Sequence, residues 1–230
     1  MIKINSEPNS RLILWDIDGT LVRLKRADSS SPHKNALFAL DYSFNQFNFE
    51  LSGLTDYEVL ISLAKSSEGK IDRKRILTAF NNLDEESRRL DKVSTFDLYP
   101  GVQEILESLI SLGWDNGILS GNTRSRIVSK LDNTGLTKYF TQDLIFGCEF
   151  GDSRENIANK AREFLQFKKY SNVLILGDTP NDIAAARAVG FPVISVATGN
   201  YSFTQLSTYK PDLLLQDLTK DAEVLFSFLK

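Results

Sequence analysis

The chain has 230 residues and a formal net charge of −3, from 27 basic and 30 acidic side chains. This balance excludes the strongly basic surface that nucleic acids and anionic membranes need, and no apolar stretch approaches the roughly 18 residues that span a bilayer. The single cysteine excludes a disulfide framework and any metal site with several thiolate ligands. Because the first ten residues also lack the apolar core of a signal peptide, we expect a soluble cytoplasmic protein.

The first predicted strand is followed directly by two acids. Apolar residues 12–15 run into Asp16 and Asp18, and Gly19 then breaks the pattern. Alternate side chains of a strand point to the same face, so the two carboxylates are expected to project together. Two like charges this close need a cation or a shared proton. The arrangement therefore indicates a hard metal ion, a proton-transfer role, or both.

The next segment is predicted to be helical. Residues 21–31 have the composition of a polar loop, and residues 32–89 show helical periodicity, interrupted at 52–56 and at 66–70. Thr55 or Asp56 can cap the helix that follows the first break. His33, the only histidine, lies where the polar loop passes into the first of these helices, and we expect it to be solvated.

The rest of the chain alternates between helices and short apolar strands. Continuous apolar strands separated by helices predict a parallel sheet that is buried on both faces. The expected fold class is α/β, a Rossmann-like parallel sheet with an inserted helical cap domain. We assign residues 1–22 and 95–230 to the α/β core and residues 23–94 to the cap. The predicted elements after the cap are helix 102–112, strand 117–119, helices 123–133 and 155–167, strand 173–176, helix 181–189, strands 193–196 and 213–215, and a last helix ending near residue 228.

Polar residues follow three of the predicted strands. Asp16 and Asp18 follow the first, the run 120–123 (Ser-Gly-Asn-Thr) follows the second, and the run 177–182 (Gly-Asp-Thr-Pro-Asn-Asp) follows the third. Ligands of open parallel sheets bind at the carboxyl ends of strands, and carboxylates, a hydroxyl and exposed amides suit a metal-bound phosphate. Each run also has a plain structural reading, because Asp-Gly is a turn signal and the other two runs can cap helices.

Three motifs give the chain a family resemblance. Asp16-Ile17-Asp18-Gly19-Thr20-Leu21 resembles the DxDGT signature of the haloacid dehalogenase-like (HAD) superfamily. The strand ending in Ser120-Gly121-Asn122 resembles the second motif of that family, and Gly177-Asp178-Thr179-Pro180-Asn181-Asp182 resembles the fourth. The insertion after the first motif is similar to a C1-type cap, and Gly53-Leu54-Thr55-Asp56 resembles a cap loop of phosphoglycolate phosphatase-like members.

The third family motif is a lysine or arginine, usually Lys-Pro, and that pair is absent at this place. Arg154, which opens the helix before the third strand, is the best candidate for this cation. Lys160, further along the same helix, is the alternative.

The resemblance implies a Mg²⁺-dependent phosphatase that acts on a small organic phosphate ester through an aspartyl-phosphate. Asp16 would be the nucleophile and Asp18 the general acid and base. In the implied site, Mg²⁺ is held by Asp16, the backbone carbonyl of Asp18 and Asp178, with Asp182 behind them. The phosphate is held by Ser120, Gly121, Asn122 and either Arg154 or Lys160. Thr55 and Asp56 either cap a helix or face the substrate.

Asp18 also separates branches of the family, because an alkoxide leaving group needs a proton and a halide does not. It therefore favours a phosphatase or a phosphomutase of the β-phosphoglucomutase kind over a dehalogenase. A non-catalytic binding or regulatory protein on the same scaffold is the remaining alternative.

Overall fold

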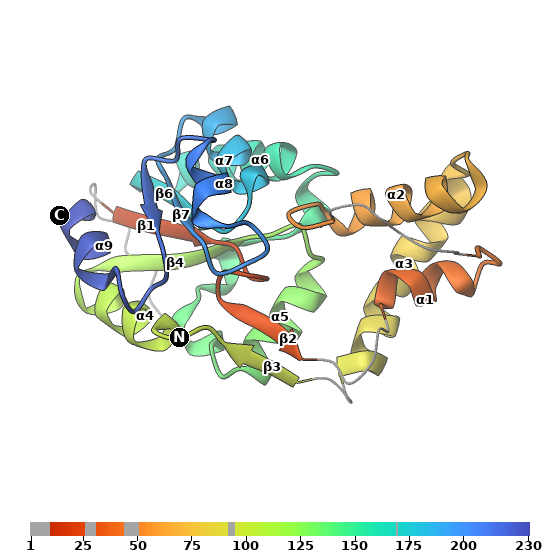
Figure 1. Ribbon diagram of the computed structural model, residues 1–230, viewed down its shortest axis with the longest axis horizontal. Coiled ribbons are helices and arrows are strands. Elements are labelled where there is room, and N and C mark those ends of the chain that lie inside the picture. Colours follow the sequence, from red (N-terminus) through yellow and green to blue (C-terminus); the bar gives the residue numbers. More distant parts are fainter. Residues whose placement is uncertain (1–9, 26–30, 44–50, 92–94, 169) are drawn as a thin grey trace.

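A six-stranded parallel sheet forms the centre of the protein (Figure 1). The structure is a computed structural model, and it describes residues 10–25, 31–43, 51–91, 95–168 and 170–230. Along the sheet the strands follow the order β5-β4-β1-β6-β7-β8, and each neighbouring pair is parallel. The predicted α/β class is confirmed. The strands are β1 Ser10–Trp15, β4 Trp114–Leu119, β5 Ile145–Phe146, β6 Tyr170–Gly177, β7 Val193–Val196 and β8 Leu213–Leu215.

The central strand β1 is apolar on both sides, as a strand covered by helices on both faces must be. Ile13 and Trp15 pack into one apolar cluster with α4 (Val102–Ser111), α5 (Arg124–Asn133) and α9 (Ala222–Phe228). Leu12 and Leu14 pack into the cluster on the other face, with α6 (Arg154–Phe167), α7 (Pro180–Val189) and α8 (Phe203–Ser207). These layers bury the sheet and leave its carboxyl edge for a site.

Three helices stand to one side of the sheet core (Figure 1). They are α1 (Pro32–Phe38), α2 (Asp56–Glu68) and α3 (Arg73–Asp91), and they surround a small apolar cluster of their own that includes Leu37, Leu60 and Ile76. Thr55 caps α2 with a full capping box, and Gly69 ends it in the left-handed conformation that favours glycine. No helix in the described ranges combines the length and apolar character needed to cross a membrane.

The prediction of a loop directly after Leu21 is wrong in part. Val22–Lys25 forms strand β2, which pairs antiparallel with β3 (Thr95–Leu98), so that the chain enters and leaves the helical segment side by side. Three of the four residues of β2 are exposed, and its partner lies about 70 positions away in sequence. Local pattern therefore carried little signal for either strand, because their pairing depends on a long-range contact.

Candidate active site

The carboxyl edge of the sheet brings the three polar runs together. The register places Trp15 beside Ile118 on one side and beside Leu176 on the other. Asp16 is therefore the first residue beyond β1, while Ser120 and Asp178 leave the two neighbouring strands at about the same level. The three strand ends predicted from the sequence do converge.

Asp16 and Asp18 line the same cavity, and the charge of Asp18 contributes to the raised pKa of Asp16, but the two carboxylates have different charged partners. The Asp16 amide still donates to the Leu176 carbonyl at 2.8 Å, which continues the strand. The chain then turns, since the amides of Leu21 and Val22 both donate to the Ile17 carbonyl. Asp18 follows this tight turn, and its partners differ from those of Asp16.

Asp16 belongs to a buried group of three carboxylates. Ligand oxygens of Asp16, Asp178 and Asp182 lie within 4.8 Å of one another, and all three residues are buried. Arg154 lies among them, with its Nη1 2.8 Å from Asp16 Oδ1 and its Nη2 bound to Asp182 Oδ1. One guanidinium thus faces three acids in a space shielded from water.

Burial is the main cause that raises the pKa of Asp16, against the effect of Arg154. Burial and the neighbouring Asp16 charge raise the pKa of Asp178 to about 8. Carboxylates in this state favour a divalent cation, because the cation supplies the charge that the surroundings lack. Thr20 donates to Asp178 Oδ1 at 2.8 Å and leaves Oδ2 beside Gly19 and Gly199, where a Cβ would overlap it. The donor set therefore fits a small hard ion such as Mg²⁺.

Asp182 has a different task from the other two acids. Its Oδ2 accepts from the amide and hydroxyl of Thr179, at 3.0 and 2.7 Å, and this capping box starts α7. Its Oδ1 accepts from Arg154. Because both oxygens are engaged, Asp182 fits a supporting position behind a metal better than direct ligation. The capping role is thus present in the structure, and the supporting role stays a prediction.

Asp18 lies in a second polar cluster with Ser120, Asn122 and Lys130. Asn122 Nδ2 donates to Asp18 Oδ2 at 2.8 Å and to Ser120 Oγ at 3.0 Å. The Lys130 ammonium binds the same Asp18 oxygen and also Asn122 Oδ1, at 2.9 Å. Burial opposes the ionisation of Asp18, but Lys130 outweighs it, with help from Arg126 and Asn122, and holds the pKa of Asp18 below its usual value.

Lys130 is a residue of this cluster that the sequence did not predict. The only sequence signal for it is a lysine inside the apolar stripe of α5, between Ile127 and Leu131. Lysine is almost never fully buried without a partner, so a lysine on a stripe that faces a sheet suggests an acid across from it. Which acid that is depends on the fold.

Arg154 and Lys160, the two candidates for the cation of the third motif, lie on different faces of α6. Six residues rotate the chain by about 240° around a helix axis, so the two side chains point in different directions. Arg154 is buried against Asp16, whereas Lys160 is exposed and pairs with Glu163 at 2.8 Å. The structure therefore does not bring Lys160 to the site.

Asp56 connects the α1–α3 segment to the sheet core. Its Oδ2 accepts from the Thr123 amide at 2.8 Å, and its Oδ1 binds Arg126 and lies 2.8 Å from His33 Nε2. The Asp56 amide donates to the Gly121 carbonyl at 2.7 Å. The expectation that His33 is solvated is wrong, because its side chain is 12% exposed and packs against this carboxylate. Thr55 acts as the cap of α2.

Asp56→Ala is expected to destabilise the protein by about 3 kcal/mol, because it takes a buried carboxylate away from Arg126. Arg126 and His33 hold the pKa of Asp56 well below its usual range although burial, the largest single influence, opposes them. The stabilisation is therefore present above the unfolded pKa of about 4 and is lost as the pH falls. Denaturant unfolding at pH 7 and at a pH well below 4 measures it. Exposed Asp143→Ala is the control, and equal unfolding curves for the two variants would contradict the assignment.

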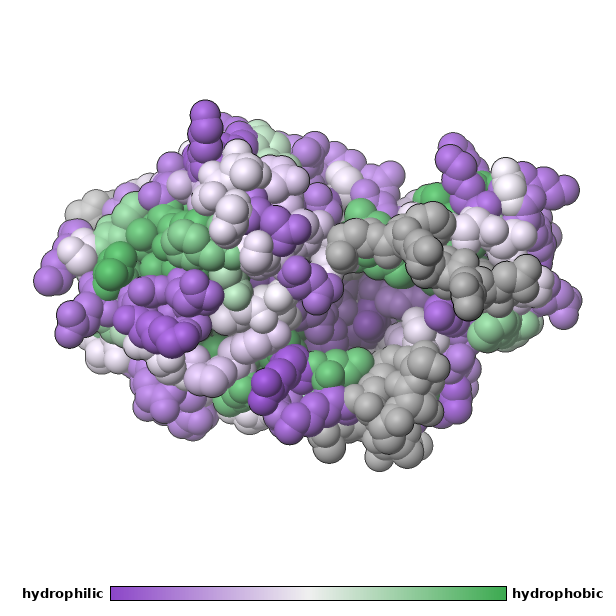
Figure 2. Space-filling view, viewed as in Figure 1, coloured by the Kyte–Doolittle hydropathy of each residue, from purple (hydrophilic) through white to green (hydrophobic). Residues whose placement is uncertain are grey.

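A cavity of about 320 Å³ opens over these clusters and is shared by the sheet core and the α1–α2 region. Figure 2 shows a hollow with hydrophilic walls between the two parts. Its described lining includes both acids of the first motif, the predicted phosphate-binding residues other than Lys160, and Asp56, which connects α2 to the sheet core. These are Asp16, Asp18, Ser120, Gly121, Asn122, Arg154, Arg126, His33, Asp56 and residues 51–54.

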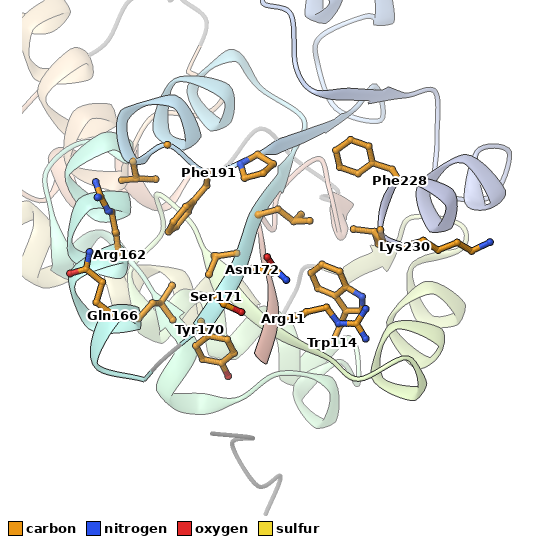
Figure 3. Close-up of a pocket in the computed structure, with 17 residues that line it drawn as sticks. Arg11, Trp114, Arg162, Gln166, Tyr170, Ser171, Asn172, Phe191, Phe228 and Lys230 are labelled. Carbon is orange, nitrogen blue, oxygen red and sulfur yellow. The ribbon is translucent and has the colours of Figure 1, made fainter. Parts of the chain in front are cut away.

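A larger hollow of about 990 Å³ lies at the opposite edge of the sheet, around Tyr170 and Trp114 (Figure 3). Arg11, Arg162 and Lys230 are among the residues that line it, and Phe191 and Phe228 contribute aromatic rings. Among its described lining residues there is no Asp, Glu, His or Cys. It thus lacks the acids that the chemistry at the carboxyl edge requires.

Comparison with known proteins gives a family match. The model of the family described as "haloacid dehalogenase-like hydrolase" matches residues 11–190 of this chain. A phosphoglycolate phosphatase of Vibrio parahaemolyticus is 27% identical over 95% of this chain and 97% of its own length. A phosphoglycolate phosphatase of Synechococcus elongatus is 30% identical over 89% of this chain and 92% of its own.

Solved structures with the same fold agree with this match. A predicted phosphatase from Clostridium acetobutylicum superposes with a TM-score of 0.71 at 18% identity, over 95% of this chain and 99% of that one. A putative β-phosphoglucomutase from Bacteroides vulgatus superposes with a TM-score of 0.70 at 19% identity, over 96% and 91% of the two chains. At these identities the likeness concerns the fold alone.

Proposed function

The chain belongs to the haloacid dehalogenase-like hydrolases, and from that premise we propose that it is a Mg²⁺-dependent phosphatase that hydrolyses a small organic phosphate monoester through an aspartyl-phosphate. The observation that carries the proposal is the placement of Asp16. Its buried carboxylate lies at the end of β1 between Arg154 and Asp178, and it lines the cavity. The two phosphoglycolate phosphatase relatives favour a phosphate ester as the substrate.

The first chemical step is attack by Asp16 on phosphorus. The bond from phosphorus to the leaving oxygen breaks while a phosphorus–oxygen bond to Asp16 forms, and Asp18 gives its proton to the leaving oxygen. Arg154, buried beside Asp16, and Ser120, the first residue after β4, would bind the phosphoryl oxygens whose charge develops in this step.

The second step is hydrolysis of the aspartyl-phosphate. Asp18, now a carboxylate, takes a proton from water as the water oxygen attacks phosphorus. The Asp16 carboxylate is released together with inorganic phosphate, so each proton given in the first step is recovered in the second. Lys130 and Asn122 favour the charged state of Asp18 that this step needs.

Mg²⁺, when bound, would neutralise the carboxylates and the substrate phosphate so that one anion can attack another. Asp16, Asp178 and the Asp18 backbone carbonyl would hold it, and Asp182 would orient Arg154 and Thr179 behind them. Few carboxylates and several water ligands are typical of Mg²⁺ at phosphate.

Residues 23–94 are proposed to act as a cap over this site, and residues 1–22 and 95–230 as the catalytic core. Two observations support the division: α1–α3 have their own apolar cluster, and the β2–β3 pair joins the two ends of the segment. Closure over the cavity would exclude water during the first step and select the leaving group. The cytoplasmic location expected from the sequence stays a prediction.

A phosphate-release screen tests the function. The wild-type protein with Mg²⁺ is expected to release inorganic phosphate from p-nitrophenyl phosphate and from at least one alkyl phosphate in a panel that contains phosphoglycolate. No release from any compound would overturn the proposal and favour a non-catalytic protein on this scaffold. Conversion of a sugar phosphate without net release would instead identify a phosphomutase, the second candidate suggested by the neighbour from Bacteroides vulgatus.

A further inference from the structure

Lys130 occupies a place in the fold where a charged side chain is unfavourable. It lies on the stripe of α5 that faces the sheet, next to Ile127 and Leu131, and its side chain is only 7% exposed. Removing an ammonium from water lowers stability unless its partners compensate fully. A leucine or methionine would fill this position without that penalty, so packing alone does not explain the lysine.

The two partners of Lys130 are both polar atoms of the second cluster. An ammonium only donates hydrogen bonds, and Lys130 donates to Asp18 Oδ2 and to Asn122 Oδ1. The second contact determines how the Asn122 amide is oriented, because the atom that faces an ammonium must be the oxygen. Asn122 Nδ2 is thereby directed at Asp18 Oδ2 and Ser120 Oγ.

The result for Asp18 is asymmetric. Its Oδ2 receives hydrogen bonds from both Lys130 and Asn122, whereas none of the described residues is found hydrogen-bonded to Oδ1. The side chain is 46% exposed and lines the cavity together with Asp16. One oxygen is therefore held from the α5 side, and the other is available to a molecule in the cavity.

We propose that Lys130 is a positioning residue for phosphoryl transfer, which together with Asn122 holds Oδ2 of Asp18 so that Oδ1 is the oxygen that exchanges a proton with the leaving group. This inference rests on the proposed phosphatase function and adds to it a residue outside the family motifs. Lys130 acts through Asp18 and Asn122, without contact with the reacting phosphorus.

Two variants and one control test the proposal. Lys130→Met keeps the length of the side chain and removes both hydrogen bonds, Lys130→Arg keeps the positive charge and the donors, and Lys74→Met is the same change at an exposed lysine. For each protein with Mg²⁺, kcat/KM is measured on p-nitrophenyl phosphate and on an alkyl phosphate that the wild type hydrolyses, and Tm is measured by thermal unfolding.

Lys130→Met is expected to lower kcat/KM for the alkyl phosphate by about 10- to 100-fold. This loss is a part of the rate enhancement that general acid catalysis supplies. The loss on p-nitrophenyl phosphate is expected to be about threefold or less, because a nitrophenolate leaves without taking a proton. Lys130→Arg is expected to recover part of the lost rate, and Lys74→Met to behave as the wild type.

Stability separates positioning from a structural ion pair. Asp18 is half exposed and stays solvated without Lys130, so Lys130→Met is expected to leave Tm unchanged or to raise it. A fall of activity on both substrates in proportion to a fall of Tm would overturn the proposal, and so would an unchanged kcat/KM on the alkyl phosphate. A wild-type protein that releases no phosphate would instead overturn the proposed function itself. If Lys130→Met does not fold, equal losses on the two substrates in Lys130→Arg overturn the inference.

Discussion

Asp16→Asn is expected to abolish phosphate release, with a loss of more than about 10⁴-fold in kcat, as for the removal of a nucleophile in other enzymes with covalent intermediates. The amide keeps the shape of the side chain but cannot form the acyl-phosphate. The fold is expected to persist, since Arg154 retains the carboxylate of Asp182 when Asp16 loses its charge. Steady-state phosphate release measures the effect, and Tm measures the fold.

The same variant tests the covalent intermediate. After rapid acid quench with substrate, the intact mass of the wild type is expected to show one added phosphoryl group, and that of Asp16→Asn none. Asp143→Asn, an exposed carboxylate changed in the same way, is expected to match the wild type in both assays. Activity near the wild-type level in Asp16→Asn would show that another residue is the nucleophile.

Removal of Mg²⁺ is expected to have the second largest effect. Chelation by EDTA is expected to lower kcat by about 10²–10³-fold, corresponding to several kcal/mol of charge stabilisation, and added Mg²⁺ to restore it. The reason is the crowding of Asp16, Asp178 and Asp182 around one guanidinium. Turnover that is unaffected by EDTA and by added Mg²⁺ would contradict the metal site.

Asp178→Asn adds a stability readout to the metal prediction. The folded pKa of Asp178, about 8, lies above the unfolded value of about 4, so the unfolded carboxyl is charged where the folded one still holds its proton. The free energy of unfolding of the metal-free protein therefore falls as the pH rises from about 4 to about 8. The variant is expected to lack this fall.

At pH 8 in EDTA, Asp178→Asn is consequently expected to be more stable than the wild type, by about 1 kcal/mol or more, or roughly 2–4 °C of Tm for each kcal/mol. Mg²⁺ is expected to raise the Tm of the wild type and not that of the variant. Thermal unfolding with and without Mg²⁺ tests both, and a variant that is inactive but equally stabilised by Mg²⁺ would place the metal elsewhere.

Much of the site could be predicted from local sequence, because its residues directly follow predicted strands. Asp16, Ser120 and Asp178 each follow a short apolar run, and runs of this kind separated by helices form parallel strands. Parallel strands end at one edge, so residues far apart in sequence meet there without further information. Gly19 marks the turn because its φ of 90° favours glycine.

Other parts of the site and the fold could not be predicted from the sequence, because they depend on which helix face is buried and on pairing between distant segments. Arg154 and Lys160 have similar chemistry in the sequence, and only the burial of one face of α6 separates them. Strands β2 and β3 are short and largely without an apolar pattern, and they form because the two ends of an insertion meet. His33 is a largely buried partner of Asp56 because α1 packs against α2.

The sequence by itself determined the parallel α/β core, the helical insertion and the acids at the strand ends, because strand periodicity and the residues that follow each strand are local properties. Only the tertiary structure decided how those acids are partnered. Asp18 follows the turn after Ile17, and α5 brings Lys130 to it across 112 positions of sequence. Charge pairing of this kind depends on distances in space, which no local pattern records.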